Sequence, residues 1–195
     1  EKGKLEQEKM DEIYGRIQTS TSLEDATKAQ LVIEAVVENM DVKKQIFSQL
    51  DALLPKEVIL ASNTSSLPIT KIAAGSLYPE RFVGMHFMNP VPVMKLVEII
   101  SGLATAKEVT QAIREVSLKL NKVPVEVKDF PGFVSNRVLL PMINEAIYCL
   151  YEGIATKEDI DTVMKLGMNH PMGPLQLADY IGLDTCLSIL EILHE

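Results

Sequence analysis

Residues 31–54 have the sequence LVIEAVVENMDVKKQIFSQLDALL, and this stretch decides the fold. Its first seven residues form an apolar, mostly β-branched run of the kind that makes a buried strand. The following residues 40–54 place apolar side chains at helical spacing: Val42, Ile46, Leu50, Leu53 and Leu54. The stretch therefore predicts a strand followed by a helix, which is the repeating unit of an α/β fold.

The same alternation continues downstream. Strands are predicted at 58–62, 82–88, 95–100 and 123–127, and helices at 67–75 and 105–121. The second of these helices opens with Thr105 followed three residues later by Glu108, which is a capping-box pattern. Strands and helices that alternate in this way predict a mostly parallel sheet flanked by helices, and so an α/β fold class.

The pattern changes after DFPG at residues 129–132. The rest of the chain has helical periodicity, and no later segment has the periodicity of a strand. We therefore expect a domain boundary at about residue 129, with an α/β domain at 1–129 and a helical domain at 130–195. Pro141 is expected to kink the first helix of the second domain, because proline removes one backbone donor.

The composition narrows the possible functions. The chain has 195 residues, is 47% apolar, and has a formal net charge of −8. An acidic chain without a Lys/Arg cluster argues against nucleic acid as a partner. No apolar run is long enough for a spanning helix, and no signal peptide is evident, which together predict an intracellular protein. Cys149 and Cys186 lie in apolar helical patterns without CxxC spacing, so we expect reduced thiols and no metal site.

A candidate catalytic pair lies on two predicted strands. Alternation puts His86 on the same side of its strand as Gly84, a small neighbour that would leave space beside the imidazole. A lone histidine in an apolar strand is more often structural. Glu98 changes that balance, because it shares its strand face with Leu96 and Ile100, where a carboxylate is costly unless paired. A paired histidine and glutamate would suit a general base.

Two further polar features could serve a ligand. The cluster at 62–66, SNTSS, follows directly on a predicted strand, and ligands of open α/β sheets bind at the carboxyl ends of strands. An ordinary loop with a serine or threonine N-cap before the next helix explains the cluster about equally well. Asn136 has apolar neighbours near the start of a helix, which favours an inward-facing hydrogen bond.

The sequence resembles the L-3-hydroxyacyl-CoA dehydrogenases, and within them most closely the bacterial 3-hydroxybutyryl-CoA enzymes. The motifs that carry the resemblance lie in family order and spacing: IEAVVENMDVKK (33–44), ASNTSSLPIT (61–70), GMHFMNPVPVMKLVEII (84–100), DFPGFVSNR (129–137) and HPMGPLQLADYIGLD (170–184). Several long motifs in register are far more specific than any single one. The resemblance implies a Rossmann-type NAD-binding domain followed by a helical domain for substrate binding and dimerisation.

The resemblance also implies roles for individual residues. The catalytic set would be His86 as the base, Glu98 as the carboxylate that orients it, and Ser65 and Asn136 as substrate-binding residues. The residues along NAD would be Glu38, Lys43, Asn63 and Asn89, with Asn63 also facing the substrate. An acyl-CoA would be the substrate, a homodimer the assembly, and the bacterial cytoplasm or else the mitochondrial matrix the location.

One departure from the family pattern affects these expectations. The family begins with a strand, a GxGxxG turn and a helix that hold the pyrophosphate of the dinucleotide, and this sequence contains no GxGxxG. We therefore expect a piece of a longer enzyme, which alone would bind NAD weakly. The alternative is a non-catalytic remnant that keeps dimerisation and acyl-CoA binding. A related dehydrogenase of small hydroxyacids fits less well, because those enzymes typically use a lysine base.

Overall fold

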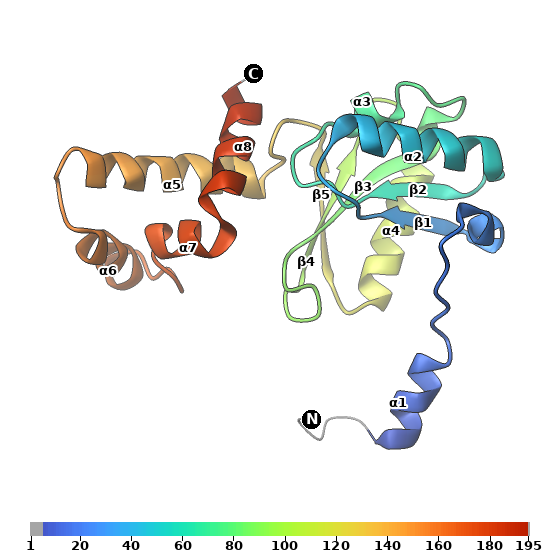
Figure 1. Cartoon of the computed structure of the whole chain (residues 1–195), viewed down its shortest axis with the longest axis horizontal. Coiled ribbons are helices and arrows are strands. Elements are labelled where there is room, and N and C mark those ends of the chain that lie inside the picture. The colour runs from blue at the N-terminus through green and yellow to red at the C-terminus, as the bar shows by residue number, and fades with distance from the viewer. Residues whose placement is uncertain (1–5, 195) are drawn as a thin grey trace.

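The computed structural model describes residues 6–194 and contains an α/β part followed by a helical part (Figure 1). Its strands are β1 (Leu31–Glu34), β2 (Ile59–Ser62), β3 (Phe82–Phe87), β4 (Leu96–Ser101) and β5 (Val123–Lys128). Its α-helices are α1 (Gln7–Tyr14), α2 (Met40–Leu53), α3 (Ile69–Ala73), α4 (Lys107–Lys119), α5 (Ser135–Tyr151), α6 (Lys157–Gly167), α7 (Pro174–Ile181) and α8 (Leu183–His194). Short 3-10 turns span η1 (Leu23–Lys28) and η2 (Pro79–Arg81).

The five strands form one sheet in the order β1-β2-β3-β4-β5. β1 pairs with β2, β2 with β3 and β4 with β5 in parallel, whereas β3 and β4 are antiparallel. The predicted mostly parallel sheet of the α/β class is therefore confirmed. The antiparallel pair has a consequence for the site, because its register places His86 directly opposite Glu98.

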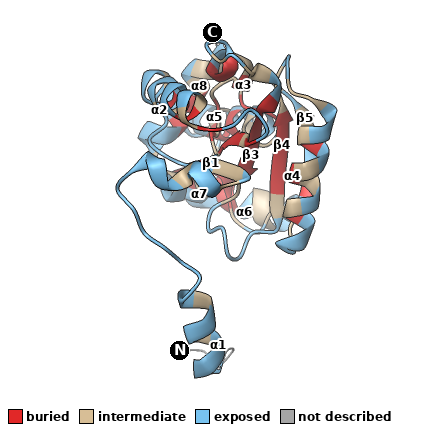
Figure 2. Cartoon of the chain, turned by 90° about the vertical axis from the view of Figure 1, so that its right-hand side faces the viewer, coloured by how far each residue is buried: buried red, intermediate tan, exposed pale blue. Residues whose placement is uncertain are grey.

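Helices cover both faces of the sheet (Figure 1). α2 and α3 pack on one face, where Phe47 of α2 and Ile69 of α3 belong to the same buried cluster as Leu60 of β2. α4 packs on the other face through Ile113, against Met85 of β3. The central strands β3 and β4 are buried along nearly all of their length (Figure 2). The sheet thus provides a rigid platform for side chains at its strand ends.

Only helices follow β5 within the described residues. α5, α7 and α8 share a buried cluster that includes Leu140, Ala178 and Cys186, and α6 joins a second cluster with α5 and α7. Both cysteines are free thiols. α1 stands away from the sheet and buries no residue (Figure 1).

Two local predictions were wrong: the capping box at the start of the 105–121 helix, and the space that Gly84 was expected to leave beside His86. The N-cap of α4 is Ala106, which has no capping side chain, and the Thr105 hydroxyl instead donates to the Phe82 carbonyl at 2.7 Å. Gly84 does not leave space beside His86, because a Cβ there would lie 2.7 Å from the Cβ of Ile100. The glycine is required for close packing of β3 against its neighbours rather than for access to the imidazole.

The start of α3 is not capped by a serine or threonine of the 62–66 segment, a possibility that the sequence alone leaves open. Its N-cap is Pro68, and the backbone N–H groups of Ile69 and Thr70 donate to the two carboxylate oxygens of Asp129 at 2.9 and 2.7 Å. Thr64 instead closes a local turn, in which its hydroxyl accepts from the Leu67 N–H. The 62–66 segment is therefore not the N-cap of α3.

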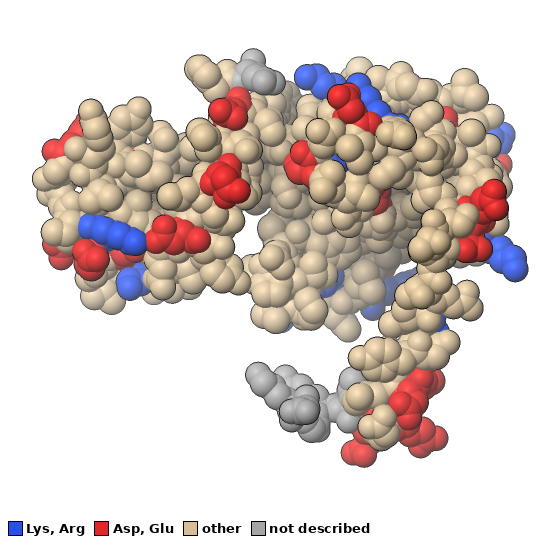
Figure 3. Space-filling model, in the orientation of Figure 1, with Lys and Arg blue, Asp and Glu red and all other residues tan. Residues whose placement is uncertain are grey.

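The surface of residues 6–194 has charged side chains of both signs (Figure 3). On the face shown in Figure 3, acidic side chains lie over the helical part, the α/β part and α1, and Lys and Arg lie over the helical and α/β parts. None of the helices in this range combines the length and the apolar character needed to cross a membrane.

Candidate active site

The centre of the site is a buried pair formed by His86 of β3 and Glu98 of β4. The Nδ1 of His86 lies 2.9 Å from Oε2 of Glu98, and the two side chains are 7% and 2% exposed. Phe133 lies beside the imidazole, with ring centroids 5.8 Å apart. The other ring nitrogen, Nε2, has no hydrogen-bond partner among residues 6–194. A carboxylate at Nδ1 orients the ring and leaves Nε2 to accept a proton from a ligand.

Glu98 also binds the start of α5. Its Oε1 accepts from the backbone N–H groups of Val134 and Ser135 at 3.1 and 3.0 Å, and its Oε2 accepts from the Ser135 hydroxyl at 2.8 Å. The chain reaches this position through Gly132 and Phe133, whose φ angles are 72° and 52°. A left-handed conformation is costly for phenylalanine, so packing must hold this turn in place. The carboxylate that orients His86 thereby also joins the sheet to the helical part.

The environment of Glu98 favours its charged form. Burial by itself raises the pKa of this carboxyl, but the hydrogen bonds from His86 and Ser135 outweigh burial and lower the pKa below its ordinary value. Glu98 is therefore a carboxylate at neutral pH, as a group that orients and stabilises an imidazolium must be.

A second set of contacts links Ser65 to the same helix and to Glu38. The Asn136 side-chain amide donates to the Ser65 carbonyl at 2.9 Å, which confirms the expected inward-facing hydrogen bond. Oε1 of Glu38 accepts from the Ser65 and Ser66 N–H groups at 2.9 and 3.0 Å and from the Thr64 hydroxyl at 2.6 Å. Asn136 follows Ser135 in the chain, so the hydrogen bonds around Glu38 and Ser65 and those around His86 and Glu98 meet at the start of α5 and together form a polar network.

Lys43 of α2 lies beneath this network rather than on its surface. Its ammonium is 2.8 Å from Oε1 of Glu34 and 3.4 Å from Oε2 of Glu38, and its side chain is 1% exposed. Glu34 also accepts from the Ser62 hydroxyl at 2.6 Å. With this packing Lys43 holds Glu38 in position.

The two asparagines expected along the cofactor have different surroundings. Oδ1 of Asn63 accepts from the Phe87 N–H at 2.9 Å, which joins the ends of β2 and β3. Asn89 is exposed just beyond β3, and its peptide bond to Pro90 is cis. Its side chain makes no hydrogen bond within the described residues, so the structure does not bring it into the connected network.

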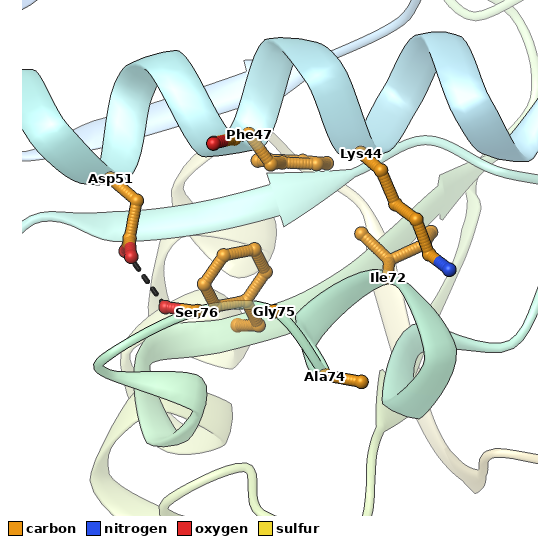
Figure 4. Close-up of a pocket in the computed structure, with 9 residues that line it drawn as sticks. Lys44, Phe47, Asp51, Ile72, Ala74, Gly75 and Ser76 are labelled. Carbon is orange, nitrogen blue, oxygen red and sulfur yellow. Dashed lines mark hydrogen bonds between the residues drawn. The ribbon is translucent and has the colours of Figure 1, made fainter.

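A cavity of about 400 Å³ lies between the carboxyl ends of the strands and α8. Its polar wall contains Glu38, Asn63 and Ser65, and its apolar wall contains Ile189 and Ile192. A second cavity, of about 370 Å³, lies between α2 and α3 and contains none of the predicted site residues (Figure 4). In that second cavity Asp51 accepts a 2.7 Å hydrogen bond from Ser76. The first cavity is therefore the one that adjoins the candidate site.

Sequence reasoning missed two residues of the site. Ser135 gave no signal, because a serine at the first position of a helix ordinarily indicates only a helix start. Glu34 is the second, and the signal was available: it is a carboxylate in an apolar strand, as Glu98 is. The rule that identified Glu98 would have identified Glu34 as well.

The lowered pKa values of the site carboxylates predict a loss of stability in acid. Burial alone raises the pKa of Glu38, but the hydrogen bond from Thr64 and the charge of Lys43 lower it overall. A carboxyl whose pKa is lowered on folding stabilises the protein above its unfolded pKa, and this contribution disappears as the pH falls through the folded value. For Glu38 and Glu98 the decline should therefore begin near their ordinary value of 4.5.

Urea unfolding from pH 7 to pH 3 measures this effect. Glu38→Gln should flatten the dependence of the unfolding free energy on pH below 4.5, while Glu57→Gln, at an exposed position, should not change it. An unchanged acid slope in Glu38→Gln would contradict the prediction.

The sequence matches two family profiles. Residues 1–130 match the 3-hydroxyacyl-CoA dehydrogenase NAD binding domain, and residues 132–195 match the 3-hydroxyacyl-CoA dehydrogenase C-terminal domain. A probable 3-hydroxybutyryl-CoA dehydrogenase of Bacillus subtilis is 63% identical over 194 residues, which is 100% of this chain and 68% of that protein. The human mitochondrial hydroxyacyl-coenzyme A dehydrogenase is 49% identical over 180 residues, 92% of this chain and 57% of that protein.

Solved structures agree with the sequence matches. The crystal structure of (S)-3-hydroxybutyryl-CoA dehydrogenase PaaH1 from Ralstonia eutropha superposes with a TM-score of 0.95 at 52% identity, covering 98% of this chain and 68% of that one. The family profiles together cover nearly the whole sequence, with the boundary between them at residue 131. The chain belongs to the 3-hydroxyacyl-CoA dehydrogenases, a family of NAD-dependent oxidoreductases.

Proposed function

We propose that this protein interconverts (S)-3-hydroxybutyryl-CoA and acetoacetyl-CoA with NAD as the redox partner. The observation that carries the proposal is the 2.9 Å contact between His86 and Glu98 beside a cavity at the strand ends. Relatives at 63% and 56% identity have the name probable 3-hydroxybutyryl-CoA dehydrogenase, which supports this acyl group over longer ones.

In the oxidation direction His86 is the general base. Its Nε2 takes the proton of the substrate hydroxyl, and Glu98 stabilises the imidazolium that forms. Ser65 and Asn136 hold the hydroxyl and the thioester carbonyl, which lowers the orientational cost of the reaction. Reduction uses the same groups in reverse, with the imidazolium returning its proton to the oxygen.

The residues at the first cavity fit a nicotinamide and its ribose. Glu38 is 36% exposed on its side chain and offers Oε2 to a hydroxyl, while Asn63 keeps its amide nitrogen as a donor because only its Oδ1 is used. Bound NAD would supply the acceptor for the hydride that leaves C3 of the substrate. Lys43 keeps Glu38 in place, and Asn89 lies at the exposed end of β3, where it can reach the cofactor. Residues 1–129 form the cofactor domain in this proposal, and residues 130–195 close over the substrate.

The test measures the oxidation of NADH by acetoacetyl-CoA as a loss of NADH absorbance, with NADH at concentrations high enough to offset the weak cofactor binding expected of this chain. Turnover that depends on both compounds supports the proposal. A protein that binds acetoacetyl-CoA in calorimetry but oxidises no NADH would instead be a non-catalytic, acyl-CoA-binding member of the family.

The assembly is proposed to be a two-fold dimer formed through the helical part. Its exposed apolar side chains include Val138, Tyr151 and Leu166, at 67%, 84% and 83% exposure. Exposed apolar groups at this density mark protein interfaces.

The acidic surface argues against nucleic acid as a partner. The similarity to bacterial enzymes supports a role in fatty acid or butanoate metabolism in the cytoplasm.

Multi-angle light scattering at micromolar concentration should give the mass of a dimer. Tyr151→Glu should shift the protein toward monomer, because it places a charge in the proposed contact. Tyr14→Glu is the control, since Tyr14 is 67% exposed on α1, outside the helical part. A parent protein that is monomeric under these conditions would rule out the dimer.

A further inference from the structure

Two hydrogen-bond donors meet at one oxygen of Glu98. Oε2 accepts from His86 Nδ1 at 2.9 Å and from the Ser135 hydroxyl at 2.8 Å. The other oxygen, Oε1, accepts from two backbone N–H groups at the start of α5. A carboxylate has about four lone-pair positions, so Glu98 has little remaining capacity for another donor. The Ser135 hydroxyl shares its acceptor atom with the catalytic imidazole.

Within residues 6–194 His86 is the ionisable group that contacts Glu98. The neighbour from β5 in the strand register is Val125, which has no charge, and α5 contributes the Ser135 hydroxyl together with its backbone amides. Phe133 packs against the imidazole without a polar group. Besides His86, Ser135 is therefore the side chain that donates a hydrogen bond to Glu98. It affects how strongly the Glu98 carboxylate stabilises a proton on Nδ1 of His86.

A hydrogen bond donated to a carboxylate stabilises the anion and makes it a weaker acceptor for other donors. The pKa of Glu98, which burial alone would raise, is lowered by the bonds from His86 and then Ser135, in agreement with this effect. Without the Ser135 hydroxyl, the negative charge would act more fully on His86. The imidazolium would then be more stable, and His86 would be protonated at a higher pH.

We propose that Ser135 is a positioning residue which, through Glu98, sets the pH at which His86 takes up its proton. The importance of Ser135 for catalysis rests on the proposed function. In that function, the Ser135 hydroxyl keeps the imidazole of His86 unprotonated, and so available as a base, at lower pH. The hydroxyl belongs to the first residue of α5, whereas His86 and Glu98 belong to neighbouring strands of the sheet.

The experiment is an NMR titration of the imidazoles in the whole chain, in the parent, Ser135→Ala and Ser135→Thr. The chain has three histidines, so His170 and His194 are internal controls, and the His86 signal is assigned by its loss in His86→Gln. Ser135→Ala keeps the backbone N–H and removes only the hydroxyl. We expect its His86 midpoint to rise by about half a pH unit, the free-energy equivalent of part of one charge-assisted hydrogen bond. Ser135→Thr keeps a hydroxyl and should restore the parent midpoint.

A His86 midpoint that is unchanged or lower in Ser135→Ala would overturn the proposal, as would an equal rise in Ser135→Thr. In the active enzyme, the acidic limb of kcat/KM against pH should move in the same direction as the NMR midpoint. If the midpoint moves but no variant oxidises NADH with acetoacetyl-CoA, the tuning stands and the proposed function fails. The two ideas are thus tested separately.

Discussion

Replacing His86 with glutamine is expected to lower kcat about 10²- to 10⁴-fold, the range usual for loss of a general base, with a smaller change in KM. Glutamine is polar and of similar length, so it can still hydrogen-bond to Glu98 across the strand pair. It cannot accept a proton from the substrate hydroxyl. Steady-state kinetics with acetoacetyl-CoA and NADH measure the change.

The control for this variant is His170→Gln, which replaces a histidine that lies between α6 and α7, outside the site. It should retain parental turnover. Equal circular dichroism spectra and melting temperatures of the two variants and the parent would show that folding is unaffected. Turnover by His86→Gln within threefold of the parent would contradict the assignment of the base.

Replacing Lys43 with methionine is expected to lower the free energy of unfolding by about 3–5 kcal/mol, the usual cost of removing one partner from a buried ion pair. Methionine has a similar length, so the packing of α2 on β1 is largely kept. Glu34 would remain a buried carboxylate, 1% exposed, without its cation. Urea denaturation gives the change in stability, and Glu38 should also lose orientation, which would weaken NADH binding.

Lys44→Met is the matched control, because the neighbouring lysine is exposed on the same helix and should change stability by less than about 1 kcal/mol. Adding Glu34→Gln to Lys43→Met should recover part of the loss, since the uncompensated charge is then removed. A double-mutant cycle measures the coupling directly. A loss in Lys43→Met no larger than in Lys44→Met would show that the pair does not stabilise the fold.

Much of the fold could be predicted from the sequence, because hydrophobic periodicity is a local property. The strand at 31–37 and the helix at 40–54 correspond to β1 and α2, although β1 ends at Glu34. The antiparallel pairing of β3 with β4 was not predicted. Strand direction depends on how the intervening loop folds, which periodicity does not record.

The errors have a common physical cause. Thr105 has the sequence of a capping residue, yet its hydroxyl bonds to the carbonyl of Phe82, which lies 23 residues away. Asp129 caps α3 from about 60 residues away in the chain. A local pattern shows that a helix end requires a partner, but the fold determines which side chain provides it.

The sequence predicted those site residues whose polarity differs from that of the strand or helix around them. His86 and Glu98 were detectable because each is a polar group in an apolar strand. Ser135 was not detectable, because its importance lies in a contact across 37 residues of sequence with Glu98. The roles of Lys43 and Asn89 came from the resemblance alone and stay predictions.

Glu98 forms contacts to the imidazole and to the first amides of α5 through one carboxylate, and this limits how the protein can change over generations. An aspartate is one methylene shorter and cannot keep every one of these bonds at its present length, and a glutamine can only partly replace the two acceptor oxygens. A mutation of Glu98 therefore affects both the orientation of His86 and the contact between the sheet and α5, so the two cannot change independently in evolution. Mutational scans that score abundance and turnover in parallel should find that substitutions at position 98 reduce both, whereas His86→Gln should reduce turnover far more than abundance.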